Sequence, residues 1–164
     1  MATQLLYLLR MDRTSAARDT CSVARTLEVV GERWTMLVLR EAFYGVRRFN
    51  DFQQLLGAPR NVLTARLQTL VDAGVLRREP YREEGARERH EYRLTEAGRD
   101  LMPALVALMQ WGDRHLADEA GGPVVVRHRD CGEQVSAVLT CAAGHAGLTA
   151  RDTVPELREQ RASA

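Results

Sequence analysis

Apolar residues recur at helical spacing through the first half of the chain. The first run consists of Val23, Leu27 and Val30. It predicts a helix over residues 21–30 that ends at Gly31. The same spacing predicts further helices over residues 34–42 and from Asn50 to Leu56.

A fourth helix is expected after the turn formed by Gly57, Ala58 and Pro59. Its apolar stripe consists of residues three or four positions apart: Leu63, Leu67, Leu70 and Val71. Polar residues lie off this stripe and are free to face outward: Arg60, Asn61, Thr64 and Gln68. The sequence Asp72-Ala73-Gly74 ends the helix.

Two strand-like runs follow, over residues 75–81 and 90–94. The loop between them, residues 82–89, is polar and rich in arginine, and Gly85 is its turn residue. A helix that ends at a glycine and leads into a charged hairpin is the layout of a winged helix-turn-helix. The sequence therefore predicts a mainly α fold with a small β-wing.

The second half of the chain is predicted to begin with a long helix from about Thr95 to Ala117. Pro103 fits this helix only if it begins nearby or kinks there. The sequence Gly121-Gly122-Pro123 marks a boundary, after which a small β-hairpin tail is expected, with a strand-like run at residues 135–139. The predicted organisation has four parts: a flexible segment at residues 1–20, the winged helix-turn-helix domain at 21–118, the ribbon-like tail at 124–148 and a disordered end at 149–164.

Composition limits the class of protein. The chain has 164 residues and a net charge of +1, so any surface that binds nucleic acid must be local. The apolar run from Leu5 to Leu9 is far shorter than the about 18 residues that a membrane span needs, and no basic segment precedes it. A cytoplasmic protein that contacts no membrane is therefore expected, and Met11 is an alternative start of translation.

The polar face of the fourth helix suits the reading of DNA. Arginine pairs with guanine, asparagine and glutamine pair with adenine, and threonine contacts several bases, so base contacts are predicted for Arg60, Asn61, Thr64 and Gln68. Contacts with the DNA backbone or from the wing are predicted for Arg48, Arg82, Arg87 and Arg89. The competing interpretation is a winged helix used for protein docking, because polar exposed helices are common and the hairpin also carries several glutamates.

Six separated motifs carry a resemblance to a known family. They are a cysteine before the first helix, Gly-x-x-Trp-Thr, Arg-Arg-Phe-Asn-Asp-Phe, Leu-Thr-x-Arg-Leu, Gly-Val-Leu and Glu-Tyr-Arg-Leu-Thr-Glu-x-Gly. Over residues 21–117 the chain resembles the HxlR-type winged helix regulators, which are related to the MarR group. The resemblance implies a homodimeric transcriptional regulator, most simply a repressor, whose first and last helices form the dimer interface. Its operator would be a pseudo-palindrome on double-stranded DNA.

The sequence departs from the family pattern at two positions. Pro59 stands where the family often has serine at the start of the recognition helix, which removes a side-chain cap. Ser22 stands where proline commonly follows the cysteine. The base specificity of relatives therefore cannot be transferred to this chain.

The three cysteines suggest two kinds of sensing. Cys21 lies at the predicted start of the first helix, where the helix dipole favours a thiolate, and the resemblance suggests that it senses electrophiles or oxidants. The alternative is a small residue packed at a dimer interface. In the tail, four residues could hold one zinc ion: His128, Cys131, Cys141 and His145. A metal-free ribbon is equally compatible, because a zinc ribbon normally has two Cys-x-x-Cys turns.

No enzyme is predicted. The chain has neither a glycine-rich phosphate loop nor a dinucleotide fingerprint, and nothing near the Cys141 and His145 pair suggests an oxyanion hole. A space lined by leucine, valine and methionine, between the last long helix and the winged domain, could hold a small-molecule effector.

Overall fold

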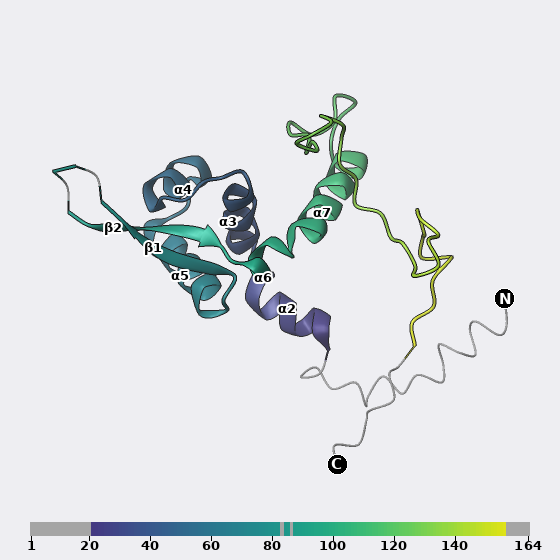
Figure 1. The fold of residues 1–164 in the computed structure, drawn as a ribbon, viewed down its shortest axis with the longest axis horizontal. Helices are drawn as coiled ribbons and strands as arrows, with labels where there is room; N and C mark the ends of the chain where they lie inside the picture. The colour runs from purple at the N-terminus through teal and green to yellow at the C-terminus, as the bar shows by residue number, and fades with distance from the viewer. Residues whose placement is uncertain (1–20, 83, 86, 157–164) are drawn as a thin grey trace, which may run out of the picture.

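The computed structural model describes residues 21–82, 84–85 and 87–156. The expectations for residues 1–20 and for the end of the chain beyond residue 156 lie outside this part. Along the described chain the elements are α2 (Ser22–Val30), α3 (Arg33–Phe43), α4 (Phe49–Leu56), α5 (Arg60–Asp72), β1 (Leu76–Tyr81), β2 (Arg89–Leu94), α6 (Glu96–Arg99) and α7 (Met102–His115). The predicted fold, mainly helical with one small antiparallel hairpin, is confirmed (Figure 1).

The core lies where α3, α4 and α5 meet the start of the hairpin. Its largest fully buried side chains are Phe52, Leu39, Leu63, Leu67, Leu70 and Leu76. The stripe predicted for α5 is confirmed, with Val71 only partly buried at its edge. Each buried leucine stabilises the fold by roughly 1.5–3 kcal/mol relative to an exposed one, so this stripe fixes which face of α5 stays outside.

The hairpin is tied to the start of α4. Strands β1 and β2 pair antiparallel from Leu76 opposite Leu94 to Tyr81 opposite Arg89. The connection before α4 pairs with β2 in turn, because Tyr92 N–H donates to the carbonyl of Arg47 at 2.8 Å and Arg48 forms an isolated bridge with Glu91. The hairpin extends away from the helices (Figure 1), but its base is held by these backbone bonds.

The prediction of one continuous helix from Thr95 to Ala117 was wrong. The structure has a short α6 and a separate α7, which meet at Asp100 and Leu101. Pro103 lies in the first turn of α7, where its missing N–H costs no hydrogen bond. The hydroxyl of Thr95 caps α6 by accepting from Gly98 N–H at 3.1 Å, and it also donates to the carbonyl of Gly74 at 2.6 Å.

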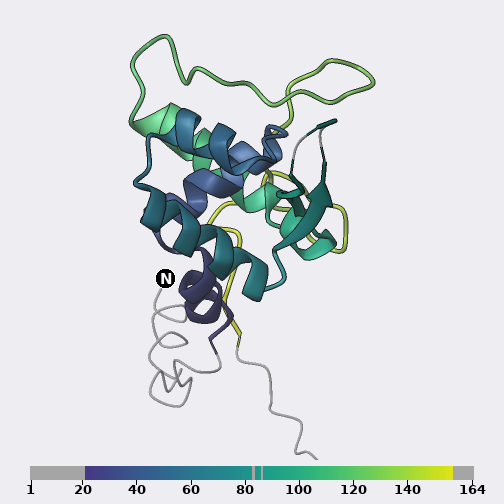
Figure 2. The ribbon, with the colours of Figure 1, turned by 90° about the vertical axis from the view of Figure 1, so that its left-hand side faces the viewer.

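The tail follows α7 without any regular element in its described residues. The expected strand at residues 135–139 is absent, and two isolated bridges, Arg127 with Gln134 and Thr140 with Ala146, close two turns instead. Figure 1 and Figure 2 show the tail as an irregular loop that extends beyond the end of α7. Across the described residues, no helix combines the length and the apolar character needed to cross a membrane.

Candidate nucleic-acid interface

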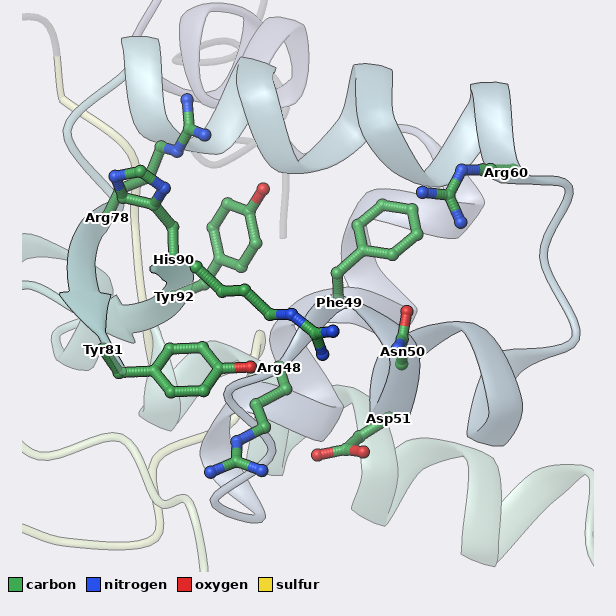
Figure 3. A pocket seen from close by; sticks show the side chains of 10 residues that line it. Arg48, Phe49, Asn50, Asp51, Arg60, Arg78, Tyr81, His90 and Tyr92 are labelled. Atoms are coloured by element: carbon green, nitrogen blue, oxygen red, sulfur yellow. The ribbon is translucent and has the colours of Figure 1, made fainter. Parts of the chain in front are cut away.

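An open groove of about 680 Å³ lies between the hairpin and the starts of α4 and α5 (Figure 3). Four arginines and one histidine face it, against a single carboxylate, that of Asp51. An excess of guanidinium groups in a groove attracts a polyanion. Ten residues line it: Arg48, Phe49, Asn50, Asp51, Arg60, Arg78, Tyr81, Arg89, His90 and Tyr92.

Helix α5 presents its polar face beside this groove. All four residues predicted to contact bases are exposed: Arg60, Asn61, Thr64 and Gln68. Two of their side chains make hydrogen bonds within the helix, since the Thr64 hydroxyl donates to the Arg60 carbonyl at 2.8 Å and the Gln68 amide donates to Asp72 at 2.7 Å. Arg60 is the only one of the four that lines the groove.

The residues predicted for backbone or wing contacts divide into two groups. Arg48 and Arg89 line the groove, whereas Arg82 and Arg87 are exposed beside the hairpin loop and do not. Sequence reasoning missed four groove residues of the hairpin: Arg78, Tyr81, His90 and Tyr92. Strand alternation could have found Arg78, His90 and Tyr92, because the pairs Arg78 with Tyr92 and Pro80 with His90 share one face of the hairpin.

The glutamates of the hairpin strands are largely neutralised within the hairpin. Glu79 and Glu91 pair across the two strands, on the opposite face of the hairpin from Arg78 and His90. Arg77 binds Glu79 at 2.7 Å, and Arg93 binds Glu79 at 2.7 Å and Glu91 at 2.6 Å. The hydrogen bond from Arg77 is the main cause that lowers the pKa of Glu79. These carboxylates therefore compensate local arginines and leave the groove positive.

Two arginines of the groove are stacked on aromatic rings. The guanidinium carbon of Arg48 lies 4.6 Å from the ring centroid of Tyr81, and that of Arg60 lies 4.8 Å from the centroid of Phe49. Both distances are within the range of cation–π interactions. In Figure 3 the two stacks stand on different sides of the groove, one on the hairpin and one between α4 and α5.

The predicted sensing residues lie away from the groove. Cys21 is exposed at the N-cap of α2 and makes no side-chain capping hydrogen bond there. The tail residues form two separate pairs, His128 Nδ1 with Cys131 Sγ at 3.2 Å and Cys141 Sγ with His145 Nδ1 at 3.3 Å. Among the described residues no three potential metal ligands come together, so the structure does not join the two pairs, and zinc binding stays a prediction.

Exposed apolar side chains of α2, of α7 and of the residue after α7 form what we call the apolar surface. Large side chains on it remain more than half exposed: Val23, Leu27, Leu108, Trp111 and Leu116. Between α2, α3 and α7 lies a cavity of about 350 Å³ whose lining is almost wholly apolar and includes Leu27, Met36, Leu105 and Leu108. A small-molecule effector in this space stays a prediction.

Comparisons with known proteins agree with this geometry. The model of the HxlR-like helix-turn-helix family matches residues 29–120. The HTH-type transcriptional regulator Rv3095 of Mycobacterium tuberculosis is 53% identical over 135 residues, which are 82% of this chain and 84% of that protein. These relatives are transcriptional regulators and not enzymes.

Two solved structures extend the comparison. The crystal structure of PA1607 is 40% identical, has a TM-score of 0.74 and covers 87% of this chain and 98% of its own. The redox regulator HypR in its oxidized form is 31% identical, has a TM-score of 0.54 and covers 60% of this chain and 100% of its own.

Proposed function

This chain belongs to the HxlR-like helix-turn-helix family of DNA-binding transcriptional regulators, and on that premise we propose that it acts as a homodimeric repressor on a pseudo-palindromic operator. The observation that carries the proposal is the arginine-lined groove beside the exposed polar face of α5. In this arrangement α5 enters the major groove and Arg60, Asn61, Thr64 and Gln68 face base edges. The hairpin follows the flanking DNA backbone with Arg82, Arg87 and Arg89, and Arg48 contacts that backbone from the start of α4.

Dimerisation is supported by the apolar surface of α2 and α7. Leu27 of α2 and Leu108 of α7 are each 57% exposed, and both line the cavity between these two helices. A contiguous apolar surface of this kind is uncommon on a monomer and typical of an interface between copies. Two copies related by a two-fold axis would present two α5 helices to one side of the DNA.

A selection experiment tests the proposed DNA binding. The purified full chain is incubated with a random pool of 30-bp duplexes, and the bound DNA is sequenced after several rounds. The expected result is a pseudo-palindrome whose half-sites are about 10 bp apart, centre to centre. Arg60→Ala should lose the enrichment, whereas Arg129→Ala, an exposed arginine of the tail, should keep it. Failure to enrich any sequence would favour the alternative role in protein docking.

The proposed dimer is tested by measuring mass in solution. Leu27→Arg places a charge within the apolar surface and should yield monomers in light scattering coupled to gel filtration. Val138→Arg is the matched control, because Val138 is 60% exposed on the tail and should leave the dimer intact. A wild-type monomer at micromolar concentration would contradict the dimer.

Redox sensing through Cys21 is a second candidate function. It is favoured by the similarity to HypR and by the exposed position of Cys21 at the start of α2, next to the apolar surface. Diamide removes two electrons and two protons from a pair of thiols, so Cys21 would form a disulfide with a thiol of the second copy or of a small thiol compound. Diamide should then abolish binding to the selected duplex. With diamide present, Cys21→Ser should still bind the selected duplex. The control variant that replaces Cys131 and Cys141 by serine should lose binding with diamide, as the wild type does.

A further inference from the structure

We propose that Tyr81 and Phe49 are positioning residues, whose rings hold Arg48 and Arg60 ready for DNA on the two sides of the groove. The inference rests on the proposed DNA binding and adds to it how two flexible side chains become ordered before DNA arrives. It is carried by two aromatic stacks in one groove, each between a cation and a ring from a different element.

The first stack joins the hairpin to the start of α4. The backbone of Arg48 is fixed twice, because Arg48 bridges to Glu91 of β2 and its carbonyl accepts from Phe52 N–H at 3.1 Å in the first turn of α4. Its guanidinium lies 4.6 Å from the ring centroid of Tyr81, the last residue of β1 (Figure 3). Backbone and side chain of Arg48 are therefore both held against the hairpin.

The second stack joins the two helices of the helix-turn-helix. Phe49 is the first residue of α4 and packs partly against the core, so its ring has a fixed place. Arg60 is the first residue of α5, and its guanidinium lies 4.8 Å from the centroid of that ring. Figure 3 shows the Arg60 side chain directed from the start of α5 toward Phe49.

Stacking orders an arginine without using its hydrogen-bond donors. A guanidinium covered on its face keeps its N–H groups in plane, where they can bind a phosphate or a guanine edge. An unstacked arginine would lose more side-chain freedom on binding DNA, and that loss weakens affinity. At an exposed site the cation–π contribution corresponds to roughly a two- to five-fold change in affinity for each stack.

The two stacks should affect binding differently. Arg48 precedes α4 and is proposed to contact the DNA backbone, so loss of Tyr81 should weaken binding to every DNA sequence equally. Arg60 opens the recognition helix, so loss of Phe49 should lower the discrimination between the selected duplex and a duplex with one altered base pair.

The test is a thermodynamic cycle on Arg48 and Tyr81, with the selected 30-bp duplex and a random duplex as probes in fluorescence anisotropy. Tyr81→Leu should weaken binding to both probes by about two- to five-fold. Tyr81→Phe, which keeps the ring, should bind as the wild type does. When Arg48 is already alanine, Tyr81→Leu should have no further effect, because the cation that the ring holds is gone.

Phe49 is tested with a matched pair and a melting control. Phe49→Leu should reduce the discrimination ratio by about two- to five-fold, and Phe49→Tyr should restore it. Because Phe49 also packs on the core, thermal melting of both variants is measured. If Phe49→Leu is unfolded at the assay temperature, the Tyr81 cycle alone decides.

The outcomes separate the two proposals. Wild-type protein that binds both probes equally would overturn sequence-specific binding and, with it, this inference. The wild type could prefer the selected duplex while Tyr81→Leu weakens binding as much in the Arg48→Ala background as in the wild type. That result would overturn the positioning role alone. A Tyr81→Leu variant that binds as tightly as the wild type would do the same.

Discussion

Gly98 shows how one residue of a sequence motif fixes the junction between the winged domain and α7. A Cβ atom placed on Gly98 would lie 2.2 Å from the carbonyl oxygen of Val75, more than 1 Å short of the 3.4 Å at which ordinary contact begins. That oxygen also accepts from Thr95 N–H at 3.1 Å. Gly98→Ala must therefore separate α6 from the start of the hairpin or break this hydrogen bond.

The cost of Gly98→Ala can be bounded. Overpacking of a filled site costs about 1–3 kcal/mol and a weakened hydrogen bond about 1 kcal/mol, whereas alanine in a helix returns about 1 kcal/mol. The net loss of roughly 1–3 kcal/mol corresponds to a fall in Tm of about 2–12 °C for a chain of this size. Gly112→Ala is the matched control, because its Cβ meets nothing within 4 Å in α7. It should raise the Tm by about 2–4 °C.

The assay is thermal melting followed by circular dichroism, with all proteins at one concentration so that association does not shift the Tm. The same substitution at two helical glycines is expected to act in opposite directions. A Gly98→Ala variant that melts at or above the wild-type temperature would refute the close approach of α6 to Val75. A Gly112→Ala variant that is destabilised as strongly would refute the reasoning from local space.

Three further predictions concern the interface, the hairpin and the tail. Arg87→Ala should weaken binding equally on the selected and the random duplex and lower the slope of log K against log salt by about 1; a loss confined to the selected duplex would assign Arg87 to base reading. Arg77 and Arg93 lower the pKa of Glu79 below its ordinary 4.5, so its ion pairs stabilise the hairpin above that pH and lose effect as the pH falls through the lowered pKa. The Tm difference between wild type and Glu79→Gln should accordingly shrink as the pH falls below 4.5, and a difference that grows would contradict the sign. The side chain of Gln110 accepts from Ala137 N–H at 3.0 Å and donates to the carbonyl of Val135 at 3.3 Å. Gln110→Leu should therefore speed hydrogen exchange of the Ala137 amide by about two- to ten-fold. An unchanged exchange rate would show that other contacts hold the tail.

Periodicity in the sequence was sufficient to locate the first helices and the hairpin. The stripe of Leu63, Leu67 and Leu70 predicted which face of α5 is buried, because a 3.6-residue repeat maps directly onto one side of a helix. Periodicity did not show the break between α6 and α7, although Pro103 indicated that a helix begins or kinks nearby. The position of α6 against the hairpin could not be predicted, because it involves the Thr95 hydroxyl reaching Gly74 and the absence of a side chain at Gly98 facing Val75, which are contacts between distant parts of the chain.

The candidate site was predicted in part. The exposed set on α5 followed from the same repeat, and the placement of these residues on its surface agrees with that prediction, although their contacts with bases stay predicted. The stacks of Arg48 on Tyr81 and of Arg60 on Phe49 could not be foreseen, because they depend on strand register and on how α4 meets α5. The regular structure of the tail was overestimated, since the strand-like residues 135–139 pair with no strand in the described chain.

The central claim is tested most directly by titrating the full chain with the selected 30-bp duplex and with a scrambled duplex of equal composition, over a range of salt concentrations. The account predicts that the selected duplex binds at least about 10³-fold more tightly, with one dimer per duplex, and that log K falls linearly with log salt for both. Equal affinity for the two duplexes at every salt concentration would contradict it.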